Sequence, residues 1–120
     1  MINFLVNEAI FLLKNNKNSL LIDVRTPEEW SLGIPYINKI TDTLLVNWLQ
    51  DRNNNHVFAT EIGKKISDKN MHLVFICRSG YRSSLAASLI ISYGYRNCYN
   101  VIDGIEGTNG WKNNGLPFNN

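Results

Sequence analysis

Cys77 stands in a stretch of the chain whose residue types favour nucleophilic chemistry. It follows the apolar run 73–76 and precedes Arg-Ser-Gly-Tyr-Arg-Ser at positions 78–83. Two arginines close to the thiol, and a glycine that permits positive φ, predict a tight turn whose backbone N–H groups converge on one point. A cysteine beside arginine and ahead of a helix ionises readily, and the thiolate is the reactive form. The stretch therefore predicts a reactive cysteine in a small anion-binding cradle.

The alternative interpretation is an inert buried thiol with two ordinary surface arginines. Free cysteine is among the most buried residue types, so a cysteine that follows an apolar strand would favour this alternative if nothing came after it. The two arginines around Gly80, however, have no evident packing purpose. They favour a reactive Cys77.

The elements on either side of Cys77 are expected to place it at the carboxyl end of a buried strand. Residues 73–76 form a continuous apolar run with β-branched members, which is typical of a strand buried on both faces. From Ser84 onward, apolar residues recur at helical spacing until Gly94, a residue type suited to a left-handed helix stop. Because ligands bind at the carboxyl ends of parallel strands, this position suits a functional site.

The rest of the chain is expected to form short strands and helices. In chain order we expect a helix over 4–14 capped by Asn3 or Asn7, a strand over 20–24, a helix beginning at the Thr26-Pro27 cap, a strand over 44–49, a helix over 58–66 and a last strand over 97–101. The asparagine tract 53–55 is expected to be a loop. Trp48 is expected in the core rather than at a ligand, because large aromatic side chains are highly buried on average.

Composition and charge describe one ordinary globular domain. The 120 residues are 44% hydrophobic and 18% charged, and the formal net charge of +2 gives no general attraction to nucleic acid or acidic membrane. The N-terminus lacks a basic segment before its apolar residues, and no apolar run reaches the ~18 residues of a membrane span. We therefore expect a cytoplasmic protein without nucleic-acid or membrane partners, in a compartment where thiols stay reduced.

Three acidic and basic residues near the first internal strand invite two interpretations. Asp23, Arg25 and Glu29 could act as an acid–base set. A charged pair that closes the strand-to-helix turn is the better interpretation.

The remaining cysteine and the histidines offer weaker candidates. Cys98 is expected to be buried and inert; the alternative is a resolving cysteine that traps a persulfide of Cys77 as a disulfide. His56 and His72 stand at no metal-ligand spacing, so no metal is expected. His72 comes one strand-length before Cys77 and should lie at the opposite end of the sheet. A general base for the thiol is therefore not expected among the histidines.

The segment Cys77-Arg-Ser-Gly-Tyr-Arg-Ser83 resembles the active-site loop of rhodanese-like sulfurtransferase domains. Residues 21–30, Leu-Ile-Asp-Val-Arg-Thr-Pro-Glu-Glu-Trp, are similar to the opening strand and the acidic-aromatic signature of that family. The features Asp103-Gly104, Trp111 and Gly115-Leu-Pro117 are similar to its C-terminal part. In order and spacing these motifs cover nearly the whole chain.

The resemblance implies a single rhodanese-like domain over residues 1–120. The implied fold is a three-layer α/β fold, with a small, mainly parallel central sheet of about five strands and helices on both faces. The match is weakest over residues 34–55, where the Gly-His-Ile of many family members is replaced by Gly33-Ile-Pro. Asp103 to Gly107 is expected to be a turn beside the site.

The resemblance also implies an activity, thiosulfate sulfurtransferase. Cys77 would carry sulfane sulfur as a persulfide, from thiosulfate or another persulfide donor to a thiophilic acceptor, which is cyanide in vitro and a thiol or dithiol protein in cells. The expected substrate-binding residues are Arg78, Ser79, Gly80, Tyr81, Arg82 and Ser83. The two arginines would hold the small anionic donor, and an exposed Tyr81 would shape the choice of acceptor. No organic cofactor is expected, because the enzyme itself carries the sulfur.

Two other functions remain open at the level of sequence. A cysteine phosphatase or arsenate reductase also places Cys and Arg around an oxyanion, but those loops resemble Cys-x5-Arg, whereas Arg82 follows Cys77 after four residues. The shorter loop makes a smaller cradle, suited to a sulfur atom. A catalytically idle rhodanese-like module used for binding or regulation is the second alternative. Such modules commonly lose the cysteine, and this chain keeps it.

Overall fold

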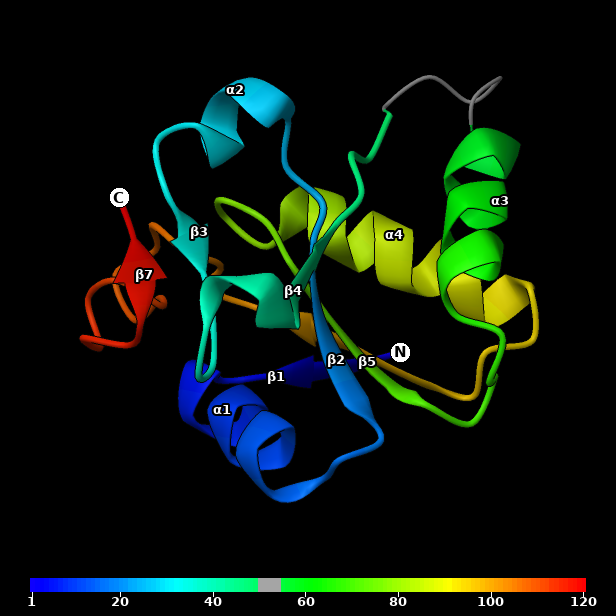
Figure 1. Ribbon diagram of the computed structural model, residues 1–120, viewed down its shortest axis with the longest axis horizontal. Coiled ribbons are helices and arrows are strands. Elements are labelled where there is room, and N and C mark those ends of the chain that lie inside the picture. The colour runs from blue at the N-terminus through cyan, green and yellow to red at the C-terminus, as the bar shows by residue number, and fades with distance from the viewer. Residues whose placement is uncertain (50–54) are drawn as a thin grey trace.

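The computed structural model describes residues 1–49 and 55–120 (Figure 1). Its main sheet has five strands in the order β1-β6-β5-β2-β4, and every neighbouring pair is parallel. The strands of this sheet are β1 (Ile2–Phe4), β2 (Ser19–Asp23), β4 (Thr43–Leu45), β5 (His72–Ile76) and β6 (Asn97–Val101). The helices are α1 (Val6–Asn15), α2 (Pro27–Trp30), α3 (Asn55–Lys65) and α4 (Tyr81–Ser92), with a short 3-10 helix over Ile40–Asp42. A separate antiparallel pair joins β3 (Ile34–Pro35) to β7 (Phe118–Asn119).

The sheet is covered on both faces, which confirms the expected α/β fold. Helices α3 and α4 lie on one face, and α1 lies on the other with the C-terminal segment (Figure 1). The side chains of β5 alternate between the two cores: Leu73 and Phe75 face α3 and α4, whereas Val74 and Ile76 face α1. The strand is therefore buried on both sides, as its continuous apolar sequence predicts.

The N-terminal segment differs from the expected helix over 4–14. A short strand, β1, comes first, and α1 begins only at Val6. The N-cap is Leu5 rather than Asn3 or Asn7, and the Leu5 N–H donates to Glu8 Oε1 at 2.8 Å. The strand forms because pairing with β6 satisfies backbone groups that would otherwise be open at the edge of the sheet. That pairing is made with residues far along the chain.

The helix starts and stops near the site follow local chemistry. Thr26 caps α2 and accepts a hydrogen bond from the Glu29 N–H at 3.3 Å, and Pro27 occupies the first helical position, as expected. Gly94, just past the end of α4, has a φ of +95°. The expected left-handed helix stop is therefore confirmed.

The middle of the chain is less regular than expected. The strand expected over 44–49 is shorter in the structure, where β4 covers only Thr43–Leu45. Beyond its end, the Val46 N–H still donates to Asp23 O at 3.1 Å. Trp48 is buried in the core, as expected, with its ring edge-on to Phe58. Helix α3 starts at Asn55, so the end of the expected asparagine loop is helical; residues 53–54 lie outside the described part of the chain.

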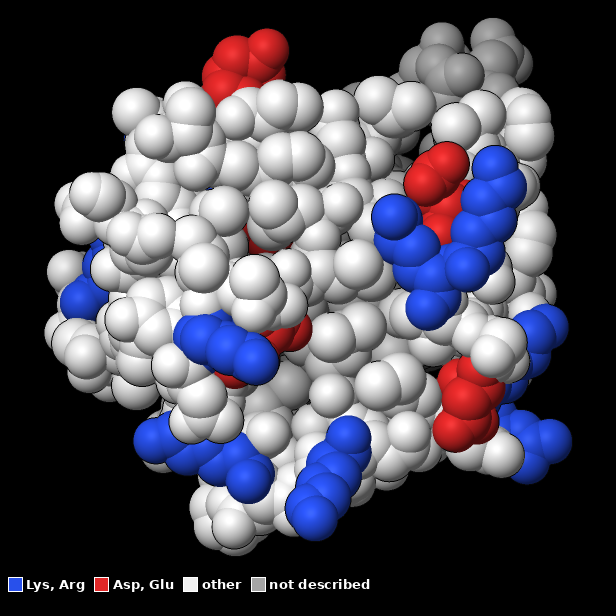
Figure 2. Space-filling model, in the orientation of Figure 1, with Lys and Arg blue, Asp and Glu red and all other residues white. Residues whose placement is uncertain are grey.

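Charge is interspersed on the face of the molecule shown in Figure 2, where lysines and arginines lie beside acidic residues and most of the surface is uncharged. Within 1–49 and 55–120, the longest apolar helix falls short of what a bilayer span requires.

Candidate functional site

Cys77 follows the last residue of β5 and is fully buried. The turn after it is shorter than the expected 78–83, because α4 begins at Tyr81 and Gly80 is its N-cap residue. Gly80 has a φ of +94°, and a β-carbon there would lie 2.2 Å from the carbonyl oxygen of Ile102. Only glycine fits this position without strain, and it sets the direction in which the helix leaves the strand.

The first turn of α4 directs its donors toward the sulfur of Cys77. The Gly80 N–H donates to Sγ at 3.1 Å and the Ser83 N–H at 3.4 Å, while Ser83 Oγ lies 3.2 Å from Sγ. N–H groups in the first turn of a helix lack partners within the helix, so they are available to an anion. The expected convergence of backbone N–H groups on one point is thus present, with the sulfur at that point.

The segment Asp103–Gly107 forms the neighbouring wall of the site, as expected. The Ile105 N–H donates to the carbonyl oxygens of Cys77 and Arg78 at 2.9 and 3.1 Å, and the Glu106 N–H donates to Arg78 O at 2.9 Å. At Gly104 the φ is +59°, and a β-carbon would lie 2.5 Å from Arg78 O. The two loops are therefore in close backbone contact, and this contact holds the chain on the carbonyl side of Cys77.

Arg82 makes an ion pair that the sequence did not indicate. Its guanidinium donates to both carboxylate oxygens of Glu29 in α2, at 2.6 and 2.9 Å. The hydrogen bonds from Arg82 lower the pKa of the Glu29 carboxyl from 4.5 to about 2. The positive charge of Arg82 is therefore matched within the protein, whereas both arginines were expected to face the substrate.

The Asp23–Arg25 pair closes the turn after β2, as expected. Both side chains are buried, and the Arg25 guanidinium lies 2.8 Å from an Asp23 carboxylate oxygen. Arg25 also donates to the carbonyl oxygen of Gly33 at 2.7 Å, so it fixes the chain that follows α2. Because its donors are used in these contacts, the pair has a structural role.

Arg78 is exposed and differs from the other cations of this region in its pairing. Among the described residues its side chain enters no ion pair, while the neighbouring cations Arg25, Arg82 and Lys112 are each paired with a carboxylate. Beside it is a pocket of about 270 Å³. The pocket is lined by Arg25, Glu29, Leu32, Arg78, Glu106, Lys112 and Phe118. Arg78 thus adds a positive charge, without an ion-pair partner in the described part of the chain, to a lining that also holds the carboxylates of Glu29 and Glu106.

The other loop residues differ in exposure. Ser79 and Tyr81 are exposed, Tyr81 over 63% of its surface, whereas Gly80 and Ser83 are buried. Tyr81 is accessible as expected, although it starts the helix instead of sitting at the apex of a longer loop.

Comparison with known sequences agrees with the fold and the loop. Residues 5–120 match the family described as the STR4 middle domain. The chain belongs to this family. Proteins similar to this domain include the uncharacterized protein RP600 homolog of Rickettsia rickettsii, which is 42% identical over 97% of this chain and 95% of its own length. A protein of Allochromatium vinosum named sulfurtransferase is 29% identical over 98% of this chain and 95% of its own length.

Solved structures agree as well. The crystal structure of Rv0390 from M. tuberculosis superposes with a TM-score of 0.81 at 29% identity, covering 98% of this chain and 96% of that one. The expected family is confirmed: the chain is a rhodanese-like domain, related in sequence and in fold to sulfurtransferases.

Cys98 of this rhodanese-like domain lies too far from Cys77 to act as its resolving partner. Cys98 is opposite Leu73 in the register of β6 and β5, and Cys77 comes four residues after Leu73. Four residues of strand span about 13 Å, whereas a disulfide needs α-carbons within about 7 Å. Cys98 is also 3% exposed, and burial raises its thiol pKa to about 11. The expected burial of Cys98 is confirmed, and its inertness stays a prediction.

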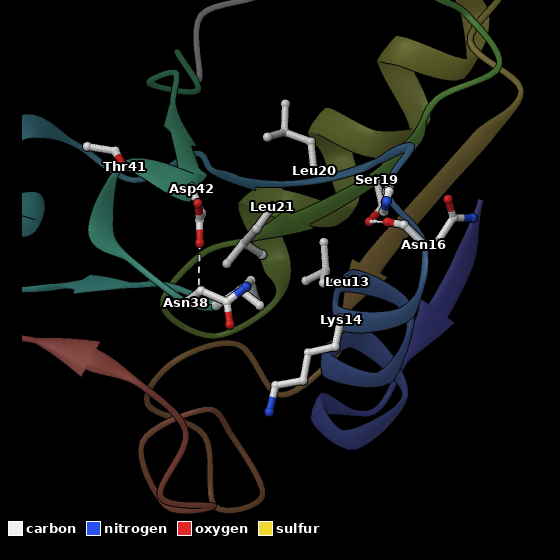
Figure 3. A pocket seen from close by; sticks show the side chains of 11 residues that line it. Leu13, Lys14, Asn16, Ser19, Leu20, Leu21, Asn38, Thr41 and Asp42 are labelled. Atoms are coloured by element: carbon white, nitrogen blue, oxygen red, sulfur yellow. Dashed lines mark hydrogen bonds between the residues drawn. The ribbon is translucent and has the colours of Figure 1, made fainter.

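A second, larger pocket of about 500 Å³ lies at the opposite end of the sheet, away from Cys77. It is bounded by the end of α1, the start of β2 and the turn before β4, where the Asn38 N–H donates to Asp42 (Figure 3). His72, at the start of β5, is at this end too, and its Nδ1 lies 2.7 Å from the hydroxyl of Tyr99. The structure thus separates His72 from the thiol, as expected.

Proposed function

We propose that this rhodanese-like domain is a thiosulfate sulfurtransferase that carries sulfane sulfur as a persulfide of Cys77. The supporting observation is the convergence of the Gly80 and Ser83 N–H groups, and of the Ser83 hydroxyl, on a single sulfur atom at a helix N-terminus. The two N–H groups stabilise negative charge on sulfur, in the attacking thiolate and in the terminal sulfur of a persulfide, and the hydroxyl is a further donor to the thiolate. The relative from Allochromatium vinosum, which is named sulfurtransferase, agrees with this activity.

The reaction has two displacements. The Cys77 thiolate attacks the outer sulfur of thiosulfate; an S–S bond forms, the S–S bond of thiosulfate breaks, and sulfite leaves with the bonding electron pair. The enzyme then holds Cys77-S-S⁻. A thiophilic acceptor attacks the outer sulfur, and the Cys77 thiolate is released. With cyanide as acceptor in vitro the product is thiocyanate; a thiol or dithiol protein would take the same role in cells, in a reducing compartment such as the cytoplasm.

The two arginines have different tasks in this proposal. Arg78 is exposed and unpaired within the described residues, so it binds the anionic donor beside the pocket. Arg82 is a positioning residue, because its ion pair with Glu29 ties the first turn of α4 to α2 and thereby holds the Gly80 and Ser83 N–H groups in place. Tyr81, exposed next to both, contributes to recognition of the acceptor.

A catalytically idle binding module is the second candidate, and one observation favours it. Cys77 has no exposed surface, so a donor must displace part of the loop or approach through it before sulfur can be transferred. If the loop does not open, the domain would bind partners through exposed residues such as Tyr81 without performing chemistry.

Intact mass after incubation with thiosulfate separates the two candidates. We expect the wild-type protein, desalted after incubation, to gain one sulfur, about 32 Da, and to lose it on addition of cyanide. The Cys77→Ser variant should gain nothing, while the matched control Cys98→Ser should gain sulfur like the wild type. Absence of the added sulfur with thiosulfate and with a persulfide donor, in folded and reduced protein, would support the idle module instead.

A further inference from the structure

Asn100 connects the candidate nucleophile to the edge of the sheet through a buried polar cluster. Its side chain is 2% exposed, although the strand around it is otherwise apolar on that side. Its amide nitrogen donates to Asn3 Oδ1 at 3.1 Å and to Gly80 O at 3.2 Å, and its Oδ1 lies 2.5 Å from Ser83 Oγ. Every polar atom of this side chain is therefore used, and two of its partners belong to the residues that surround the Cys77 sulfur.

The Gly80 carbonyl fixes which way the Asn100 amide points. A carbonyl oxygen can only accept, so the NH2 group of Asn100 must face Gly80 O and the amide oxygen must face Ser83. An amide oxygen can also only accept. The Ser83 hydroxyl must then be the donor in its contact with Asn100.

Ser83 has one hydroxyl proton and two acceptors that compete for it. Its Oγ lies 3.2 Å from Cys77 Sγ and 2.5 Å from Asn100 Oδ1. When the proton points to Asn100, Ser83 offers only lone pairs to the sulfur, which suits a thiol that donates its own S–H. When Cys77 is a thiolate, the strongest acceptor is the charged sulfur, and the hydroxyl turns toward it. The contact with Asn100 is lost in that state alone.

We propose that Asn100 is a positioning residue that holds the Ser83 hydroxyl proton while the Cys77 sulfur is neutral and releases it to the thiolate. Asn100 thus stabilises the thiol, and also the persulfide in which Sγ is bonded to a second sulfur, relative to the free thiolate. The part of the proposal that concerns the persulfide rests on the sulfurtransferase function. The part that concerns the thiol does not.

Charged groups also lie on the elements that surround Cys77. These groups are Asp23 at the end of β2 and Arg25 after it, Glu29 in α2, Arg78 after β5, Arg82 in α4, and Asp103 and Glu106 in the neighbouring turn. Asn100 and Ser83 carry no charge, and substitutions at either position leave all of these groups in place. A change in the ionisation of Cys77 would therefore report the hydrogen bonds.

The test is the pH profile of Cys77 alkylation by iodoacetamide in wild type, Asn100→Leu, Ser83→Ala and the double variant. Leucine fills a similar volume without an acceptor, so the Ser83 hydroxyl is left to donate to sulfur. We expect the midpoint for Asn100→Leu to move down by about one pH unit, a tenfold change that corresponds to loss of the Ser83–Asn100 hydrogen bond from the thiol state. In the Ser83→Ala background, Asn100→Leu should cause no shift. An unchanged midpoint in the single variant, or an equal shift in both backgrounds, would overturn the proposal.

A matched control and a second variant separate positioning from damage to the fold. Asn3→Leu removes the Asn3 partner of Asn100 and leaves its contacts with Ser83 and Gly80, so the pH profile should stay that of the wild type. The Gly80 carbonyl retains the Ser84 N–H as a donor, at 3.3 Å, when Asn100 is replaced. If Asn100→Leu does not fold, Asn100→Ala gives the same comparison. A shift with Asn3→Leu as large as with Asn100→Leu would contradict the proposed route through Ser83.

The persulfide can be tested separately. The measurement is made at a fixed ratio of thiosulfate to sulfite and at a pH where unmodified Cys77 is fully ionised. Under these conditions the ratio of persulfide to unmodified Cys77 should be about tenfold lower in Asn100→Leu than in wild type, because only the persulfide state loses the Ser83–Asn100 hydrogen bond. An unchanged ratio would contradict that part of the proposal. Alkylation needs no sulfur donor. If no persulfide forms in any variant, the sulfurtransferase function fails, while the alkylation profiles still decide the role of Asn100.

Discussion

Cys98 lies in β6 and Cys77 directly follows the neighbouring strand β5; the two are almost equally buried, yet their surroundings differ in one respect. Cys98 stands inside β6, where the N–H groups of the strand are used in pairing, and no described residue donates a hydrogen bond to its sulfur. Cys77 stands one residue beyond β5, where the free N–H groups of a helix start point at it. Burial therefore does not decide the chemistry of a thiol. Its position relative to the end of a strand and the start of a helix does.

The largest expected difference between the two cysteines is in their reaction with iodoacetamide. With its pKa raised to about 11, Cys98 at pH 7 is a thiolate in about one molecule in ten thousand. We expect peptide mapping of the folded protein to show alkylation of Cys77 alone, and of both thiols in denaturant. Comparable labelling of Cys98 in the folded state would remove the contrast between the two regions.

Replacing Gly80 should make the surroundings of Cys77 more like those of Cys98. Gly80→Ala places a β-carbon 2.2 Å from the Ile102 carbonyl oxygen at a φ of +94°, so the turn must move. We expect a loss of about 2 kcal/mol or more in the free energy of unfolding, and slower Cys77 alkylation.

The matched control is Gly63→Ala in α3, where nothing lies within 4 Å of the new β-carbon. Because alanine has the higher helix propensity, we expect Gly63→Ala to gain about 0.5 to 1 kcal/mol. Urea unfolding measures both variants. Equal stabilities for Gly80→Ala and wild type would show that the turn tolerates a side chain.

The Glu29–Arg82 pair should make the region of Cys77 sensitive to acid. The Glu29 pKa falls from 4.5 to about 2 on folding, so its contribution to stability is fully present above pH 4.5 and is lost as the pH falls toward 2. Since the pair is partly exposed, we expect Glu29→Gln to remove about 1 to 2 kcal/mol at neutral pH and to flatten the stability profile between pH 4.5 and 2. Chemical denaturation at a series of pH values tests this. A Glu29→Gln profile parallel to that of the wild type would contradict it.

Arg78→Gln should have the smallest effect, and only on donor binding. Arg78 is exposed and has no ion-pair partner among the described residues, so its removal should leave the unfolding free energy unchanged. Loss of one screened charge contact corresponds to about 1 kcal/mol, or about a fivefold rise in KM for thiosulfate. Arg82→Gln, by contrast, should lower the free energy of unfolding, because it removes the ion pair with Glu29. Steady-state kinetics and urea unfolding of both variants test this division, and an unchanged KM in Arg78→Gln would refute it.

The sequence was informative where the chemistry is local. The run into Cys77, the glycine at position 80, the Thr26-Pro27 helix start and the strand over 97–101 all depend on residues within a few positions of one another. The partner of Arg82 was missed because Glu29 lies 53 positions away and had local partners to choose from. Strand β1 was missed for the same reason, since it pairs with β6, whose residues lie far along the chain: Asn3, for example, is opposite Asn100.

Asn100 left a signal in the sequence that could have been used. It interrupts the apolar character of the strand over 97–101, and a polar residue at an inward position of a strand requires hydrogen-bond partners. Which partners it takes depends on the register between β6 and β1 and on the placement of Gly80, neither of which is a local property. The existence of a polar cluster was therefore predictable, and its members were not.

The long-range contacts of the site also bear on when it forms during folding. The Glu29–Arg82 pair joins residues 53 positions apart, and the Asn3–Asn100 contact joins residues 97 positions apart. Contacts between distant parts of a chain require the closure of long loops and slow the folding rate. A nascent or partly refolded chain carries Cys77 without this arrangement around it. The arrangement around that thiol is therefore complete only when β1 has paired with β6 and Glu29 has paired with Arg82, and the rate of Cys77 labelling during refolding is expected to show when that last step occurs.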